Sequence, residues 1–137
     1  MKQLSVFLEN RVGRLEEVLD VLAQEEINIL SLSMADTSEY GMLRLLVSNP
    51  EKGRAALKER GFSATLTEVL AVKMAHKVGE LRRVLKLLYE AGINVEYMYA
   101  LHTKTDEAAM AIKPSDLGTA VTVLQKAGVT FYEADGE

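Results

Sequence analysis

The spacing of hydrophobic residues changes in the same order in both halves of the chain. Leu4, Val6 and Leu8 stand at every second position, which is the pattern of a β-strand. The hydrophobic positions that follow have the three-and-four spacing of one helical face: Leu15, Val18, Leu19 and Leu22. A strand followed by a helix is therefore predicted for the first 25 residues.

The next segments read as a hairpin, a second helix and a last strand. Two β-rich runs, 27–35 and 41–48, flank the polar stretch 36–40. Asn49, Pro50 and Glu51 supply a cap, a first-turn proline and an acid for a second helix, and Gly61 can end it. With a closing strand over 62–68, the order is β-α-β-β-α-β, the ferredoxin-like unit.

The second half repeats the first at an offset of 66 residues. Gly79 matches Gly13, and "INV" at 93–95 matches "INI" at 27–29, while Gly128 matches Gly61 at an offset of 67. Strands are expected over 93–101, 108–113 and 129–133, with a helix starting near Ser115 and Asp116. We predict an α+β protein with one domain at 1–68 and another at 69–137. The junction between them lacks Gly, Ser and Pro, so the two domains are expected to be held rigidly.

Both faces of each predicted sheet carry hydrophobic residues. Ile27 and Ile29 alternate with Leu30, Leu32 and Met34. In the second half Ile93, Val95, Tyr97 and Tyr99 alternate with Met98 and Leu101. Because the helices cover one face only, the other face predicts a homodimer that forms through the open face of the sheet.

Composition narrows the classes of function. The 137 residues carry a net charge of −4 with no basic stripe, which argues against nucleic acid as a partner. No apolar run is long enough for a membrane span. The chain has no cysteine, which excludes disulfides and thiolate metal sites and favours the cytoplasm.

Candidate catalytic groups are sparse. His76 and His102 fall in different elements, and no nucleophile, metal-binding or phosphate-loop motif is present. Acidic clusters such as Glu16 with Glu17 are typical of solvated helix faces. We therefore predict no catalytic residue, no metal and no cofactor.

The remaining candidate is the strand-to-helix junction "NRVGRL" at 10–15 and its counterpart "HKVGEL" at 76–81. Gly13 and Gly79 can serve simply as turn residues. Alternatively, the start of a helix presents unpaired N–H groups and the positive end of a dipole, and a glycine lets a small anion approach. One glycine is too few for a dinucleotide fingerprint, so a ligand of amino-acid size fits better.

Two copies of the β-α-β-β-α-β unit, each with an Asn- or His-x-x-Gly-x-Leu junction and a later "IN[I/V]", resemble tandem ACT domains over essentially the whole chain. The resemblance implies two domains side by side in one continuous, mainly antiparallel sheet with helices on one face. It also implies an amino acid bound at the seam, between the glycine junction of one domain and the second strand of its neighbour.

The resemblance implies two unequal sites. In the first site Asn10 would offer its amide, Gly13 with its neighbours Arg11 and Val12 would offer backbone N–H groups, and Leu15 would anchor the helix. Asn94 and Val95 would face them. The second site would set His76, Val78, Gly79 and Leu81 against Asn28 and Ile29. Since His76 replaces the amide or acid, the Asn10 site is expected to be the stronger.

The leading hypothesis is a non-catalytic protein that binds an amino acid and modulates a partner enzyme of amino-acid or related metabolism. One alternative is an interaction module with ACT architecture and no ligand. Another is a small enzyme on a ferredoxin-like frame, because fold does not fix function.

Overall fold

The computed structural model describes residues 1–36, 39–75, 77–103 and 107–132. The chain divides into two compact units. We call Lys2–Thr67 the N-terminal unit, and Met1 together with the described residues from Glu68 onward the C-terminal unit.

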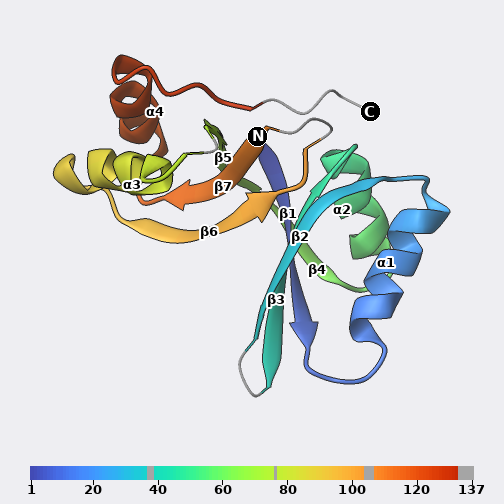
Figure 1. Cartoon of the computed structure of the whole chain (residues 1–137). Helices are drawn as coiled ribbons and strands as arrows, with labels where there is room; N and C mark the ends of the chain where they lie inside the picture. Colours follow the sequence, from blue (N-terminus) through green and yellow to red (C-terminus); the bar gives the residue numbers. More distant parts are fainter. Residues whose placement is uncertain (37–38, 76, 104–106, 133–137) are drawn as a thin grey trace. The chain divides into compact units, whose positions relative to one another are not determined.

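The N-terminal unit has the predicted order of elements (Figure 1). These are β1 (Lys2–Glu9), α1 (Arg14–Gln24), β2 (Ile29–Asp36), β3 (Tyr40–Val47), α2 (Pro50–Glu59) and β4 (Ser63–Glu68). Their sheet has the strand order β2-β3-β1-β4, in which β3 runs antiparallel to both β1 and β2. The edge strands are therefore β2 and β4.

The C-terminal unit repeats this arrangement with one strand fewer. It contains β5 (Leu70–Met74), α3 (Glu80–Glu90), β6 (Val95–Leu101), β7 (Ala108–Pro114) and α4 (Leu117–Lys126), with the antiparallel strand order β5-β7-β6. Of the strand predicted at 129–133, the described residues keep only a bridge between Val72 and Phe131, and Glu133 lies outside the described residues. The N–H of Val129 instead donates to the Leu124 carbonyl at the end of α4. Hydrogen bonds to β5 therefore begin only at Thr130.

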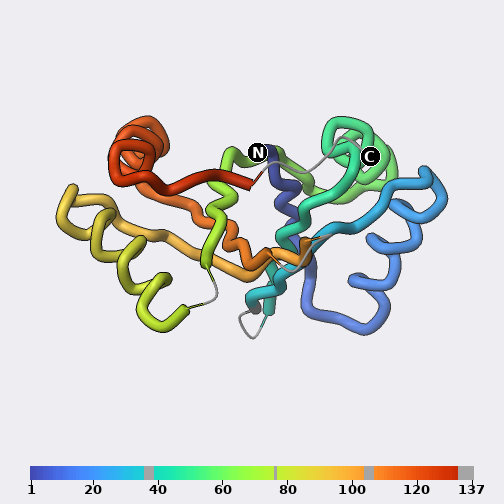
Figure 2. Tube along the Cα trace, turned by 45° about the horizontal axis from the view of Figure 1, so that its top comes forward, coloured from blue at the N-terminus to red at the C-terminus, as the bar shows by residue number. Residues whose placement is uncertain are grey.

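In each unit the two helices lie on one face of the sheet (Figure 2). The hydrophobic residues of that face are buried beneath them. In the N-terminal unit Leu4 lies opposite Leu45, and Val6 lies opposite Leu43. These four side chains are fully buried with residues of α1 and α2: Val18, Leu22 and Leu57. Burial of a large aliphatic side chain contributes about 1.5–3 kcal/mol, so this face holds the unit together.

The core of the C-terminal unit has the same plan. Val72 and Ile112 of the sheet pack with Val84 and Leu88 of α3 and with Leu124 of α4. The helical spacing of Val84 and Leu88 matches that of Val18 and Leu22 in α1, as the repeat predicts. The two units thus use equivalent positions for their cores.

The predicted assignment of strand faces is wrong in part, because both second strands carry an irregularity. The register shifts between Ile29 and Ser31, and again between Val95 and Tyr97. Val95 and Met98 therefore both pack on the core, whereas Leu101 shares the other face of the sheet with Tyr97 and Tyr99. An extra residue in a strand turns the following side chains to the other face.

The described strands form two sheets, one in each unit, which differs from the single continuous sheet that the resemblance implied. Only Val69 separates β4 from β5.

The part of the chain that the structure describes contains no helix with the length and apolar character needed to cross a membrane.

Candidate functional site

The four helices begin in two different ways. Asn49 caps α2, because its Oδ1 accepts a hydrogen bond from the Lys52 N–H at 3.2 Å. Asp116 caps α4 in the same manner through the Thr119 N–H at 3.1 Å. Helices α1 and α3 begin instead at Gly13 and Gly79, and no side chain caps either of them. The uncapped helix starts are thus the two junctions singled out in the sequence.

The Gly13 junction is a tight turn held by backbone hydrogen bonds. The Arg11 N–H donates to the Glu9 carbonyl at 2.9 Å, and the Arg14 N–H donates to the Arg11 carbonyl at 3.4 Å. Gly13 has φ +89° and ψ −13°, in the left-handed region. Val12 is fully exposed. The turn therefore leaves its tip open to solvent.

The Gly79 junction repeats this geometry. The Lys77 N–H donates to the Ala75 carbonyl at 2.9 Å, and the Glu80 N–H donates to the Lys77 carbonyl at 3.3 Å. Gly79 has φ +86° and ψ −1°, and Val78 is fully exposed. His76, which was predicted to take part in this site, lies outside the described residues.

Both glycines are required by their backbone conformation and not by crowding. A Cβ atom built on Gly13 or Gly79 meets no other atom within 4 Å. Left-handed backbone is strained for any residue with a side chain, so glycine is favoured at both positions. The free space beside each glycine also leaves the start of the helix accessible to a ligand.

An open hollow of about 550 Å³ adjoins the Gly79 junction. Its lining comes from the end of β5, the junction, the start of α3 and the start of β7: Met74, Ala75, Lys77, Val78, Glu80, Leu81, Ala108 and Met110. Apolar side chains dominate this lining, and Lys77 and Glu80 add one charge of each sign. Such a combination suits a small zwitterion with an apolar part.

The two junctions differ in charge at equivalent positions. Arg14 begins α1, where its guanidinium lies 2.7 Å from the Glu17 carboxylate and 4.3 Å from the centre of the Phe62 ring. Glu80 begins α3, and its carboxylate lies 3.4 Å from Arg83. The first junction thus starts with a cation and the second with an anion.

The strand residues predicted to face the junctions lie at the beginnings of β2 and β6. Asn28 and Asn94 each donate their backbone N–H to a serine hydroxyl at 3.0 Å, from Ser48 and Ser115 respectively. The two serines return a backbone hydrogen bond at 2.9 and 2.8 Å. The side chains of Asn28 and Asn94 are exposed, and Ile29 and Val95 follow them in the edge strands.

Within each unit the structure brings together only part of each predicted site. Asn10, Gly13 and Leu15 occupy one turn, and Leu15 packs against the core of its unit. Leu81, in contrast, is 37% exposed and lines the hollow. The pairing of each junction with the strand start of the other unit stays a prediction.

Sequence reasoning missed Met74 and Met110 as residues of the hollow. Met74 ends the strand before the junction, and Met110 lies opposite Val72 on the neighbouring strand. In the sequence Met74 stands two residues before the junction, but only the register of β5 with β7 brings Met110 to it. His102, the other histidine, is exposed after the end of β6.

Among the described residues, no group of three or more His, Cys, Asp or Glu side chains is arranged to hold a metal ion.

The sequence and the fold together identify the family. The family model of an ACT domain pair matches residues 1–110. The chain belongs to the family of paired ACT domains. The uncapped glycine junctions are therefore features of an ACT domain pair, present once in each copy of its repeat. Among curated proteins, none matches this sequence.

Solved structures support the ACT fold. Protein BT0572 from Bacteroides thetaiotaomicron is 38% identical, with a TM-score of 0.90 over 98% of this chain and 93% of that one. The ligand-free regulatory subunit of aspartate kinase from Thermus thermophilus is 15% identical, with a TM-score of 0.64 over 92% of this chain and 91% of that one. At that identity the second similarity concerns the fold alone.

Proposed function

We propose that this ACT domain pair is a non-catalytic regulatory protein that binds an amino acid at its glycine junctions and modulates a partner enzyme. The observation that carries the proposal is the contrast between the helix starts. Side chains cap α2 and α4, whereas α1 and α3 begin at left-handed glycines without a side-chain cap. An uncapped helix start offers N–H groups and a positive dipole end to a carboxylate.

The chemistry of the hollow at Gly79 supports an amino acid as the ligand. A carboxylate at the helix start would leave the rest of the molecule against Met74, Met110 and Leu81. Glu80 offers an anion for the ammonium group. We therefore expect an amino acid with an apolar side chain to bind better than a charged one.

We further propose that residues 1–68 and 69–137 form the two ACT domains, and that each site is completed by the other domain. Asn94 and Val95 would complete the Gly13 site, and Asn28 and Ile29 would complete the Gly79 site. The two sites should then differ in affinity, because Arg14 begins one helix and Glu80 begins the other.

The regulatory role is supported by the kind of protein that shares this fold. One structural neighbour is the regulatory subunit of aspartate kinase. We propose that the partner is an enzyme of amino-acid or related metabolism and that the protein acts in the cytoplasm. A homodimer through the open face of the sheet also stays a prediction, supported by Phe7 and Tyr40, which are 42% and 47% exposed on that face with ring centroids 5.0 Å apart.

Isothermal titration calorimetry against the common amino acids tests the ligand. At least one should bind more tightly than about 1 mM, that is, with a free energy beyond about −4 kcal/mol. Gly13→Asp and Gly79→Asp should each remove one site, because the new carboxylate occupies the helix start and repels that of the ligand.

Gly61→Asp is the matched control. Gly61 has φ +86° and the same free space around a Cβ atom, but it lies after the end of α2. This variant should bind as the natural chain does. If no amino acid binds, or if all three variants bind equally, the interaction module without a ligand becomes the better account.

A further inference from the structure

Each glycine junction lies beside sheet positions that correspond between the two units. In the N-terminal unit Leu8, near the end of β1, lies opposite Gly41. In the C-terminal unit Met74 ends β5 and lies opposite Ala108. Residues that lie opposite each other share one face of a sheet. Gly41 and Ala108 therefore occupy matching places beside their junctions.

The neighbouring strand adds a second pair of positions. Met34 of β2 lies opposite Leu43 of β3, and Ala100 of β6 lies opposite Met110 of β7. Two sets of four residues thus match each other in the sheets. We call the first set the Gly13 floor and the second the Gly79 floor; they are Leu8, Met34, Gly41 and Leu43, and Met74, Ala100, Ala108 and Met110.

The Gly13 floor is closed, whereas the Gly79 floor is open. Leu8 and Leu43 are 1% and 0% exposed and belong to the core of their unit. Their counterparts Met74 and Met110 are only partly buried, and with Ala108 they line the open hollow of about 550 Å³. Matching sheet positions thus serve the core in one unit and a hollow in the other.

The side chain of Met34 contributes to this difference. Its terminal methyl carbon lies 2.7 Å from the place that a Cβ atom on Gly41 would take, so the side chain lies over Gly41. Methionine is a flexible side chain that fills such gaps. At the matching position Ala100 has no atom beyond Cβ, and Ala108, which matches Gly41, lines the hollow.

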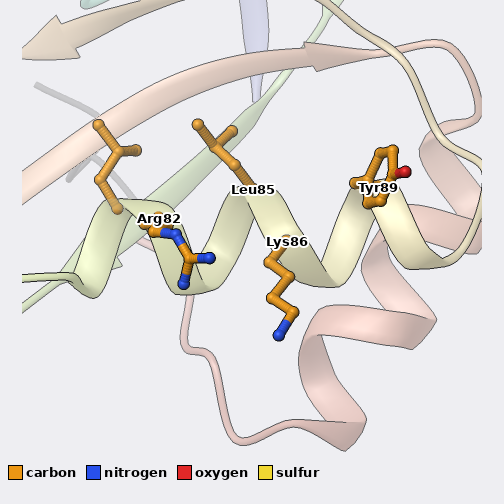
Figure 3. A pocket seen from close by; sticks show the side chains of 5 residues that line it. Arg82, Leu85, Lys86 and Tyr89 are labelled. Carbon is orange, nitrogen blue, oxygen red and sulfur yellow. The ribbon is translucent and has the colours of Figure 1, made fainter.

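The first leucine of each helix adds to the difference. Leu15 packs against the core of the N-terminal unit, whereas Leu81 is 37% exposed. Leu81 lines the hollow at the junction and also a second open hollow, of about 540 Å³, along α3. Figure 3 shows Arg82 and Lys86 projecting from α3 along this second hollow. Leu81 therefore borders both hollows and closes neither.

We propose that Met34 is a specificity residue that limits the Gly13 site to the smallest amino acids, while the Gly79 site takes a large apolar side chain. This inference rests on the proposed function, because it requires a ligand carboxylate at each helix start. From there a ligand side chain at the Gly79 junction extends over Met74 and Met110. At the Gly13 junction Met34 takes the corresponding place. Glycine and alanine, which have no atom beyond Cβ, avoid that clash.

The size of the effect follows from the length of Met34. One methylene group more or less in an apolar pocket changes discrimination by about 10- to 200-fold. The side chain of Met34 exceeds that of Ala100 by more than one methylene group. We therefore expect an effect of at least about tenfold when these residues are exchanged.

The contact of Met34 with Gly41 can be tested without a ligand. In the chain labelled with carbon-13 at its methionine methyl groups, the Met34 signal is assigned by its loss in Met34→Ala. This signal should show a nuclear Overhauser effect to the α-protons of Gly41. Absence of the effect in the natural chain would overturn the proposal.

Leucine and alanine then serve as a large and a small probe of the two junctions. Each is added to the nitrogen-15-labelled chain at millimolar concentration. The backbone amides of Val12–Leu15 report on the first junction, and those of Val78–Leu81 report on the second. In the natural chain leucine should shift only the second set, and alanine should shift both.

Exchange of the two residue types should exchange the selection. Met34→Ala should raise the affinity of the Gly13 junction for leucine by at least about tenfold, because it uncovers the Gly13 floor. Ala100→Met should lower the affinity of the Gly79 junction for leucine by a similar factor and leave its alanine binding unchanged.

Leu32→Ala and Glu96→Met are the matched controls. Leu32 is 47% exposed on the same face of β2, but it lies opposite Leu45 and away from Gly41. Glu96 is exposed in β6 and does not line the hollow. Neither variant should change which junction takes leucine.

The outcomes separate this inference from the proposed function. Equal binding of leucine at both junctions of the natural chain, or an effect of Met34→Ala no larger than that of Leu32→Ala, would overturn the inference alone. Absence of any shift with leucine and alanine in every chain would also overturn it. The same absence with all the common amino acids would overturn the proposed function.

Discussion

Glu26 is a residue at which the two copies of the repeat differ in sequence but not in conformation. It follows α1 with φ +57°, the only positive φ outside glycine among the described residues, and Gly92 follows α3 with φ +73°. After Glu26, the Ile27 N–H donates to the Leu22 carbonyl at 2.9 Å. After Gly92, the Ile93 N–H donates to the Leu88 carbonyl at the same distance. Both helices thus end in the left-handed motif that glycine favours.

Exchanging these two residue types should change stability in opposite directions. Glu26→Gly should raise the free energy of unfolding by about 1 kcal/mol through relief of left-handed strain, and Gly92→Glu should lower it by a similar amount. Urea unfolding followed by circular dichroism measures both. Glu25→Gly is the control, because Glu25 has φ −88° and gains nothing from glycine. Equal effects of Glu26→Gly and Glu25→Gly would show that the strain is absent.

The sequence predicted the turns at the glycine junctions, but it did not predict the left-handed conformation of Glu26. Gly13 and Gly79 stand between a period-two and a helical pattern, where a turn is required. At the end of α1 the first half has Glu26 where the second half has Gly92, so no glycine marks a left-handed residue there. That Glu26 nevertheless adopts the glycine conformation follows from the hydrogen bond of Ile27, a contact that the sequence pattern does not encode.

The cap of α4 carries a titrating carboxyl group, whereas the cap of α2 does not. The Thr119 backbone N–H and hydroxyl donate to Asp116, and these hydrogen bonds lower the pKa of the carboxyl group. A carboxyl group with a lowered pKa stabilises the folded chain above its unfolded pKa of about 3.9. That contribution is lost as the pH falls through the folded pKa. Asn49 caps α2 with an amide, which does not titrate.

Exchanging the two caps should therefore exchange their pH dependence. Asp116→Asn keeps an accepting oxygen and should make the loss of unfolding free energy below about pH 4 shallower. Asn49→Asp adds a titrating cap and should make that loss steeper. Urea unfolding at a series of pH values from about 6 down to about 3 compares the slopes. Identical slopes for the two variants would contradict this account of the caps.

At the level of elements the sequence predicted the order of helices and strands, but not the irregularities inside the strands. The shifts near Ser31 and Tyr97 move side chains to the other sheet face without a Gly or Pro to mark them. The last strand was predicted from hydrophobic residues, yet Val129 serves the core and the end of α4 instead. The register of the strands and competing hydrogen bonds determine which sheet face a side chain occupies and where the last strand begins.

For the whole molecule, duplication explains why two uncapped helix starts occur in one chain. The fold could be predicted because both halves carry the same hydrophobic pattern. The order of elements predicted from one half therefore supports the order predicted from the other. The candidate site could be predicted only in part. Its glycine turns are local, whereas the methionines of the hollow come from strands whose register is set by tertiary pairing.

We propose that an amino acid binds at both glycine junctions and that each site is completed by the strand start of the other unit. Nuclear magnetic resonance of the nitrogen-15-labelled chain tests it directly, with the common amino acids added one at a time to millimolar concentration. At least one amino acid should shift the backbone amides of Val12–Leu15 and Val78–Leu81, together with those of Asn28 and Asn94. The absence of any shift, or shifts confined to the capped helix starts at Lys52 and Thr119, would contradict the claim.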